Sequence, residues 1–134
     1  MSRTATADDC DVLICGLGPT GVALAILLVE RGMRVIAVEA GSEIHPLPRA
    51  AHFDHEIMRL FQQLRVLDDL AGSIRPAPAY EFRAADGSVL LRFDPDLAPS
   101  PSGWATGYMI HQPGVERALR RGLARNELAD VRLG

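Results

Sequence analysis

The sequence predicts an α/β fold: a parallel sheet built on a βαβ unit, with a β-hairpin inserted later in the chain. Two apolar runs, at residues 11–15 and 34–39, flank a segment with helical character, and this order of elements makes the two strands parallel. Farther along, two strand-like runs within residues 80–93 flank Asp86 and Gly87. An Asp-Gly pair favours the tight turn of a hairpin, because glycine adopts positive φ without strain.

Local signals mark each boundary of the βαβ unit. Residues 11–15 are apolar and partly β-branched, which predicts a strand buried on both faces, with Cys15 as a small buried thiol. Residues 19–31 have the character of a helix, and Gly32 is placed to end it. Residues 34–39 predict a second buried strand.

The second half of the chain mixes helices with extended segments. Asp54 is expected to cap a helix with an apolar face, and residues 67–70 to add a short helical turn. Pro113 is placed as the first residue of a helix that runs to Arg125. Residues 131–133 start a strand with no evident partner, so we expect an incomplete fold with exposed apolar surface. Loops or extended segments are expected at residues 41–51, 75–79 and 94–103.

Composition limits the classes of function. The chain has 134 residues, the size of one domain, and 48% of them are hydrophobic, which is enough for a packed core. A net charge of -3 provides no basic surface for nucleic acid. Residues 1–10 are expected to be a flexible N-terminus without the apolar region of a secretion signal, and no apolar stretch is long enough to span a membrane. We therefore expect a cytoplasmic protein.

Glycines between the first predicted strand and helix match the pattern G-x-G-x-x-G, which is typical of Rossmann-like nucleotide sites. Gly16 allows a tight turn, Gly18 lets the backbone approach a pyrophosphate, and Gly21 allows the helix to pack closely. The helix start offers unpaired N–H groups to phosphate. Glu39 ends the next strand, where a carboxylate can accept hydrogen bonds from both hydroxyls of an adenosine ribose and would repel a 2′-phosphate.

Ala25 and Gly32 extend this pattern into a longer fingerprint of ADP-binding proteins. FAD and NAD both contain an ADP moiety, so the spacing leaves the choice between them open. From the residues alone, an NAD-dependent dehydrogenase and an FAD-linked oxidoreductase are alternatives. A truncated nucleotide-binding protein without catalytic activity is a third.

Two further stretches extend the comparison, at residues 47–64 (LPRAAHFDHEIMRLFQQL) and 109–123 (MIHQPGVERALRRGL). With the glycine pattern, they resemble the FAD-dependent aromatic hydroxylases, the group A flavoprotein monooxygenases, and above all the 3-(3-hydroxyphenyl)propionate hydroxylase type. Those enzymes are several hundred residues long. The resemblance therefore implies that residues 1–134 are the N-terminal portion of an FAD-binding domain, with residues 80–93 as an inserted hairpin.

The resemblance also implies roles for particular residues. Glu39, with Ala40 beside it, would hold the adenosine ribose. Arg49 would reach the pyrophosphate or the flavin, and a guanidinium suits this role because its N–H groups pair with phosphate oxygens. Gln112 would contact the ribityl and phosphate region. For Arg49 and Gln112 a surface or helix-entry role without a ligand is the alternative. The pyrophosphate would be lined by Gly16, Gly18, Pro19, Thr20 and Gly21.

The implied reaction is hydroxylation of a phenolic or other aromatic compound, with FAD as the bound cofactor and NAD(P)H as a transient reductant. No side chain is a candidate catalytic acid or base, and we expect the 134 residues alone to be inactive. His52 and His55 lack a third ligand at a metal-binding spacing, so no metal is expected. Apolar surface left exposed favours a homo-oligomer.

Overall fold

The structure is a computed structural model that describes residues 10–94 and 100–134. Most of the N-terminus expected to be flexible, and part of the loop expected at residues 94–103, lie outside the described residues. The predicted βαβ unit and its parallel pairing are confirmed. The first sheet has the strand order β1-β2-β8 and is parallel throughout, with β1 (Val12–Cys15), β2 (Val35–Glu39) and β8 (Ala129–Leu133).

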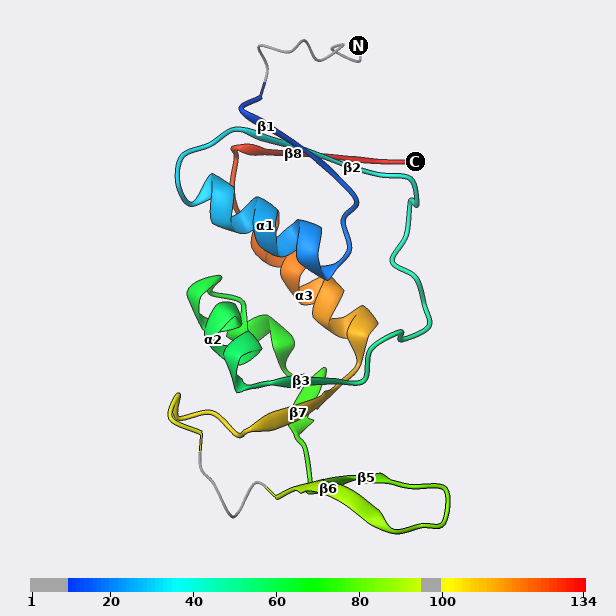
Figure 1. Ribbon diagram of the computed structural model, residues 1–134. Helices are drawn as coiled ribbons and strands as arrows, with labels where there is room; N and C mark the ends of the chain where they lie inside the picture. Colours follow the sequence, from blue (N-terminus) through cyan, green and yellow to red (C-terminus); the bar gives the residue numbers. More distant parts are fainter. Residues whose placement is uncertain (1–9, 95–99) are drawn as a thin grey trace.

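Two helices lie side by side between this sheet and a second one, as Figure 1 shows: α1 (Pro19–Val29) and α3 (Gln112–Leu123). Each helix has a proline at its start, where an N–H would have no intrahelical partner. Gly32 follows α1 with φ 78°, which suits a residue that ends a helix. In the described parts of the chain, no helix has both the length and the apolar character needed to cross a membrane.

One hydrophobic core joins the two sheets through these helices. Leu17, Val22 and Ala25, from the glycine bend and α1, have no exposed surface, and neither has Leu119 of α3. Tyr108 of the second sheet belongs to the same cluster. Burial of each large aliphatic side chain contributes about 1.5–3 kcal/mol. The cluster therefore fixes the position of α1 and of the bend that precedes it.

The second sheet is antiparallel and was not predicted from the sequence. Its strand order is β3-β7-β4, with β3 (His52–Asp54), β7 (Gly107–Ile110) and β4 (Ile74–Pro76). Strands this short show too little alternation of apolar and polar residues for a sequence to predict them. The helix α2 (His55–Gln63) and the short 3-10 helix η2 (Leu67–Leu70) occur where they were expected.

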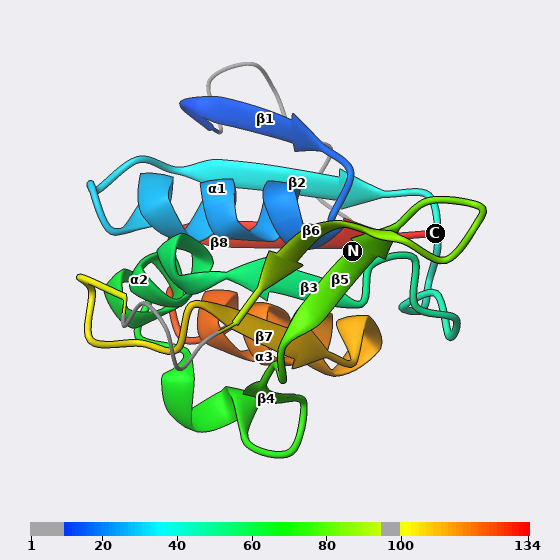
Figure 2. The same cartoon turned by 60° about the horizontal axis from the view of Figure 1, so that its bottom comes forward.

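The predicted hairpin is confirmed as an antiparallel pair, β5 (Tyr80–Arg83) and β6 (Val89–Phe93). Gly87 adopts φ 86° in the turn, the conformation for which glycine was expected. Figure 2 shows the hairpin crossing in front of the rest of the molecule. Tyr80 and Phe93 stack with their ring centroids 4.8 Å apart, whereas Leu90 is 70% exposed. The hairpin thus contributes little to the main core.

Two expectations about the first sheet are wrong. The strand β1 is not buried on both faces, since Leu13 is 59% exposed and the Cys15 thiol is an exposed, free cysteine. Among the described residues, α1 and α3 cover only one face of this sheet (Figure 1). The last strand, β8, is not without a partner, because it pairs with β2 from Val35 opposite Ala129 onward.

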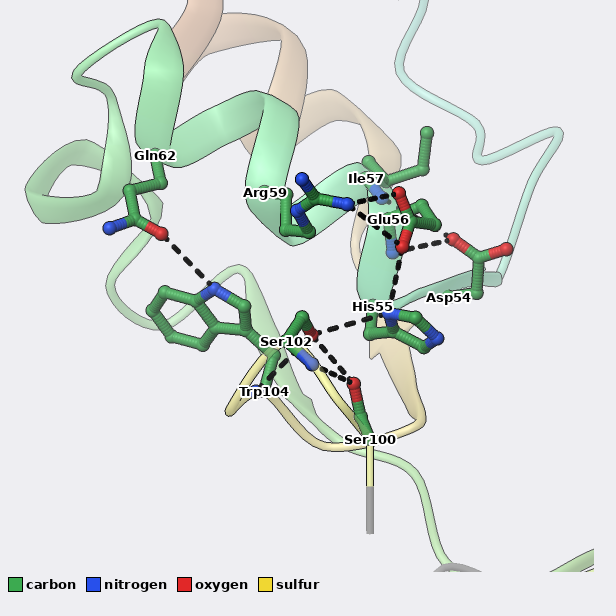
Figure 3. A network of polar contacts seen from close by, with 9 residues as sticks. All are labelled: Asp54, His55, Glu56, Ile57, Arg59, Gln62, Ser100, Ser102 and Trp104. Carbon is green, nitrogen blue, oxygen red and sulfur yellow. Dashed lines mark hydrogen bonds and ion pairs between the residues drawn. The ribbon is translucent and has the colours of Figure 1, made fainter. Parts of the chain in front are cut away.

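A polar network fixes the start of α2, as Figure 3 shows. Asp54 Oδ1 accepts hydrogen bonds from the N–H groups of Glu56 at 3.0 Å and Ile57 at 3.3 Å, which confirms Asp54 as the N-cap. The Nδ1 atom of His55 lies 3.2 Å from the Oγ of Ser102. This last contact joins the segment before β7 to the helix.

The cap predicts a measurable loss of stability. Asp54→Ala should lower the free energy of unfolding by about 1 kcal/mol, because two N–H groups at the helix start lose their acceptor. Asp54→Asn keeps an acceptor and should retain most of the stability. Urea unfolding of both variants measures the difference, and equal stability of Asp54→Ala and the wild type would contradict the capping role.

Candidate functional site

The glycines of the bend meet different physical requirements. Gly16 has φ +99°, a backbone conformation that residues with a side chain rarely adopt. A Cβ atom on Gly21 would overlap the carbonyl oxygen of Gly16, so α1 begins in direct contact with the bend. Gly18 has an ordinary φ of -69°, and a Cβ atom there would meet nothing within 4 Å. The fold therefore requires glycine at positions 16 and 21. At position 18 the missing side chain instead leaves open the space above the bend.

The start of α1 has the features that favour an anion. Gly18 is the N-cap residue, no side chain caps the helix, and its first turn contains no acidic residue. The first N–H groups of a helix have no intrahelical acceptor, and the helix dipole places partial positive charge at the same end. A phosphate group would supply the acceptor oxygens and the negative charge that this end lacks.

Glu39 is tied to the same bend. Its Oε2 atom accepts a hydrogen bond from the N–H of Leu17 at 2.8 Å, and its Oε1 atom accepts one from the N–H of Gly41 at 3.2 Å. These hydrogen bonds, that from Leu17 above all, hold the pKa of the Glu39 carboxyl below its usual value. The carboxylate is therefore ionised and oriented at the carboxyl end of β2, the edge where open α/β sheets bind ligands.

A hollow of about 380 Å³ lies between the bend, the end of β2 and α3. Its volume falls within the range of small-molecule sites, roughly 300–1,000 Å³. Of the residues that the sequence nominated, Gly18, Glu39 and Arg49 line it together. Ala40 is exposed next to Glu39. The other nominated residues in the bend and the first turn of α1 are Gly16, Pro19, Thr20 and Gly21.

Gln112 does not line this hollow but anchors the loop that does. Its side chain is 7% exposed, and its Oε1 atom accepts hydrogen bonds from the N–H groups of Arg49 and Ala50, both at 2.8 Å. Its Nε2 atom donates to Glu116 Oε1 at 2.9 Å, and Glu116 is 4% exposed. The second Nε2 hydrogen makes no hydrogen bond with the described residues. The contact with the ribityl and phosphate region that the resemblance implied therefore stays a prediction.

Among the lining residues that the sequence reasoning did not nominate, Glu116 and Arg120 belong to α3. Both follow Gln112 at steps of four residues, which places all three on one face of the helix. This spacing was the available signal. Arg49, by contrast, was nominated and is exposed on the rim. Within the described residues, no hydrogen bond or ion pair engages its guanidinium.

The arrangement fits the ADP part of a dinucleotide. The helix start and Arg49 match the charge of a diphosphate, and the Glu39 carboxylate matches two ribose hydroxyls. In the described parts of the chain, no group of three or more His, Cys, Asp or Glu residues could hold a metal ion. His52 instead packs against Tyr80, with ring centroids 5.2 Å apart. The described residues of this site can bind a ligand, and none of them is assigned a catalytic role.

The bonds to Glu39 predict a pH dependence of the bend. Because the folded-state pKa is lowered, the ionised carboxylate contributes stability above the unfolded-state pKa and loses it as the pH falls through the folded-state value. In an NMR titration the Glu39 carboxyl should titrate below the ordinary glutamate value of about 4.3. The Leu17 amide signal should move with the same midpoint. A Leu17 amide that ignores this titration would contradict the contact.

The anchoring role of Gln112 can be tested separately. Gln112→Ala removes the acceptor of two loop amides, so hydrogen exchange at Arg49 and Ala50 should accelerate. The free energy of unfolding should fall by about 1–3 kcal/mol, as for polar groups left without a partner. Gln63→Ala, at the exposed end of α2, is the matched control and should change neither quantity. Unaltered exchange at both amides in Gln112→Ala would show that the loop is held by other contacts.

Known proteins resemble this chain over nearly its whole length. Residues 9–134 match the model of a family described as FAD binding domain. The chain is 38% identical over 124 residues to a probable NADH-specific resorcinol 4-hydroxylase of Rhodococcus jostii, a match that covers 92% of this chain and 23% of that protein. It is also 36% identical over 134 residues to a 3-(3-hydroxy-phenyl)propionate/3-hydroxycinnamic acid hydroxylase of Comamonas testosteroni. This match covers 100% of this chain and 22% of that protein. The chain thus spans less than a quarter of the length of these relatives.

The fold matches solved structures as well. The p-nitrophenol 4-monooxygenase of Pseudomonas putida DLL-E4 gives a TM-score of 0.77 at 21% identity, over 90% of this chain and 31% of that one. At this level of identity the likeness shows the fold alone. The family match decides between the two cofactors that the glycine spacing left open, in favour of FAD. The chain belongs to the FAD binding domain family, whose model matches residues 9–134.

Proposed function

We propose that this chain is the FAD-binding portion of an NAD(P)H-dependent monooxygenase that hydroxylates an aromatic compound. One observation carries the proposal: the open glycine bend and the carboxylate of Glu39 are joined by a hydrogen bond of 2.8 Å from the N–H of Leu17. In sites for the ADP part of a dinucleotide, the diphosphate occupies such a bend and the ribose lies at such an acid. The hydrogen bond couples these two subsites.

Each nominated residue has a place in this proposal. The diphosphate lies over Gly16 and Gly18, against the N–H groups that begin α1. Arg49 reaches the diphosphate or the flavin from the loop, and Gln112 positions Arg49 through its backbone. Glu39 accepts from the adenosine ribose, with Ala40 beside it. Pro19, Thr20 and Gly21 form the helix turn under the diphosphate.

Bound FAD, once reduced by NAD(P)H, supplies the oxygen chemistry in this proposal. The names of the relatives support this reading, since one is called NADH-specific and both are named for phenolic compounds. The chain spans 23% and 22% of those two relatives.

A cytoplasmic setting and a homo-oligomer belong to the same proposal. The two cysteines of the chain, Cys10 and Cys15, are free, which suits a reducing compartment. Large apolar side chains such as Leu13 and Leu90 are well exposed, at 59% and 70%, and favour association.

Flavin binding tests the proposal directly. Glu39→Arg removes the acceptor of the ribose hydroxyls and adds a cation, and Gly18→Val fills the space above the bend. Each change should raise the dissociation constant for FAD at least about tenfold, the equivalent of ~1.4 kcal/mol. Titrating each purified variant with FAD, with flavin fluorescence as the signal, measures both dissociation constants.

Matched controls separate binding from folding. Glu30→Arg makes the same charge reversal at the far, exposed end of α1 and should leave the FAD affinity unchanged. Gly18→Val should keep the melting temperature of the wild type, because φ at this position suits valine and the Cβ atom meets nothing. Equal FAD affinity of the wild type, Glu39→Arg and Gly18→Val would remove the assignment.

A further inference from the structure

We propose that Arg120 is a diphosphate-binding residue of this site, with its guanidinium reaching the anion from α3 while Arg49 reaches it from the loop. This inference rests on the proposed function, since it assumes a nucleotide in the hollow. Neither the glycine pattern nor the family resemblance nominates this arginine.

The first support is position. Arg120 lines the same hollow as Gly18, Glu39 and Arg49. Its Nη2 atom donates to the carbonyl oxygen of Leu17 at 3.1 Å, and Leu17 lies between two glycines of the bend. The guanidinium is therefore tethered to the backbone over which a diphosphate would lie. Figure 1 shows how the fold allows this, because α3 runs alongside α1.

The second support is an incomplete set of partners. A guanidinium carries five N–H donors, and the bond to Leu17 is the one hydrogen bond that the Arg120 side chain makes among the described residues. Its Nε atom is buried without a partner, the one such side-chain atom in the described chain. Within the described residues, no carboxylate lies within ion-pair distance of the Arg120 guanidinium. The partly buried guanidinium of Arg120 therefore lacks a counter-ion, whereas most buried charges and polar groups in native proteins have a partner.

The neighbouring acids do not fill this role. Both oxygens of Glu39 are bonded to backbone N–H groups, and Glu116 accepts from Gln112. The charge of Arg120 acts on Glu39 only through space, as the smallest of the effects that lower the pKa of that carboxyl. A diphosphate offers several anionic oxygens, and a guanidinium can take two of them at once. The missing counter-ion and the free donors therefore point to the same ligand group.

Affinities for FAD, ADP and adenosine test the inference, because the three compounds share adenosine and only the first two contain a diphosphate. Arg120→Met should weaken FAD and ADP binding about tenfold, or ~1.4 kcal/mol, and leave adenosine binding within about twofold. Arg120→Lys, which keeps the charge without the planar fork, should recover part of the loss. Arg117→Met removes the same charge from the exposed face of α3 and should change none of the constants.

Other outcomes would overturn the inference. An equal loss of ADP and adenosine affinity in Arg120→Met would mean that Arg120 acts by holding the bend through Leu17. Unchanged ADP and FAD affinity would mean that the guanidinium does not meet the diphosphate. In either case the wild type still binds FAD and the proposed function stands. A wild-type protein that binds neither FAD nor ADP refutes the proposed function itself, and this inference with it.

Discussion

The close contact between α1 and the glycine bend is the constraint on which the rest of the site depends. Because a side chain at Gly21 would overlap the carbonyl of Gly16, the helix can begin this close to β1 only where the backbone is bare. Val22 and Ala25 then bury the helix against the sheet. With the helix in place, the N–H of Leu17 meets the carboxylate of Glu39. The close packing at Gly21 thus determines where the charged carboxylate of Glu39 lies in the hollow.

The helix α3 gives the site its second wall, and here the sequence was a weaker guide. Glu116 Oε1 accepts a hydrogen bond from Gln112 Nε2, and this leaves the Oε1 atom of Gln112 facing the loop amides. The spacing of Gln112, Glu116 and Arg120 placed them on one helix face. It did not show that this face meets the bend, because that depends on how α3 packs against α1. Arg49 was nominated by the family resemblance alone.

The parts of the fold that local chemistry determines were predictable from the sequence: the βαβ unit, the cap at Asp54 and the hairpin turn at Gly87. The strands β3, β4 and β7 were not, because their existence depends on pairing between distant segments, such as Phe53 opposite Tyr108. The same cause explains the errors at Cys15 and β8. Whether a strand face is covered, and which strand lies next to it, are properties of the assembled sheet.

Glu39 is held at both carboxylate oxygens before any nucleotide arrives. Each oxygen accepts one main-chain hydrogen bond and keeps a lone pair for another. On the proposed assignment, a sugar with adjacent 2′ and 3′ hydroxyls satisfies both oxygens at once, whereas a 2′-deoxy sugar leaves one of them without its donor. On that assignment, the backbone at Leu17 and Gly41 orients Glu39 so that it would favour ribonucleotides over deoxyribonucleotides.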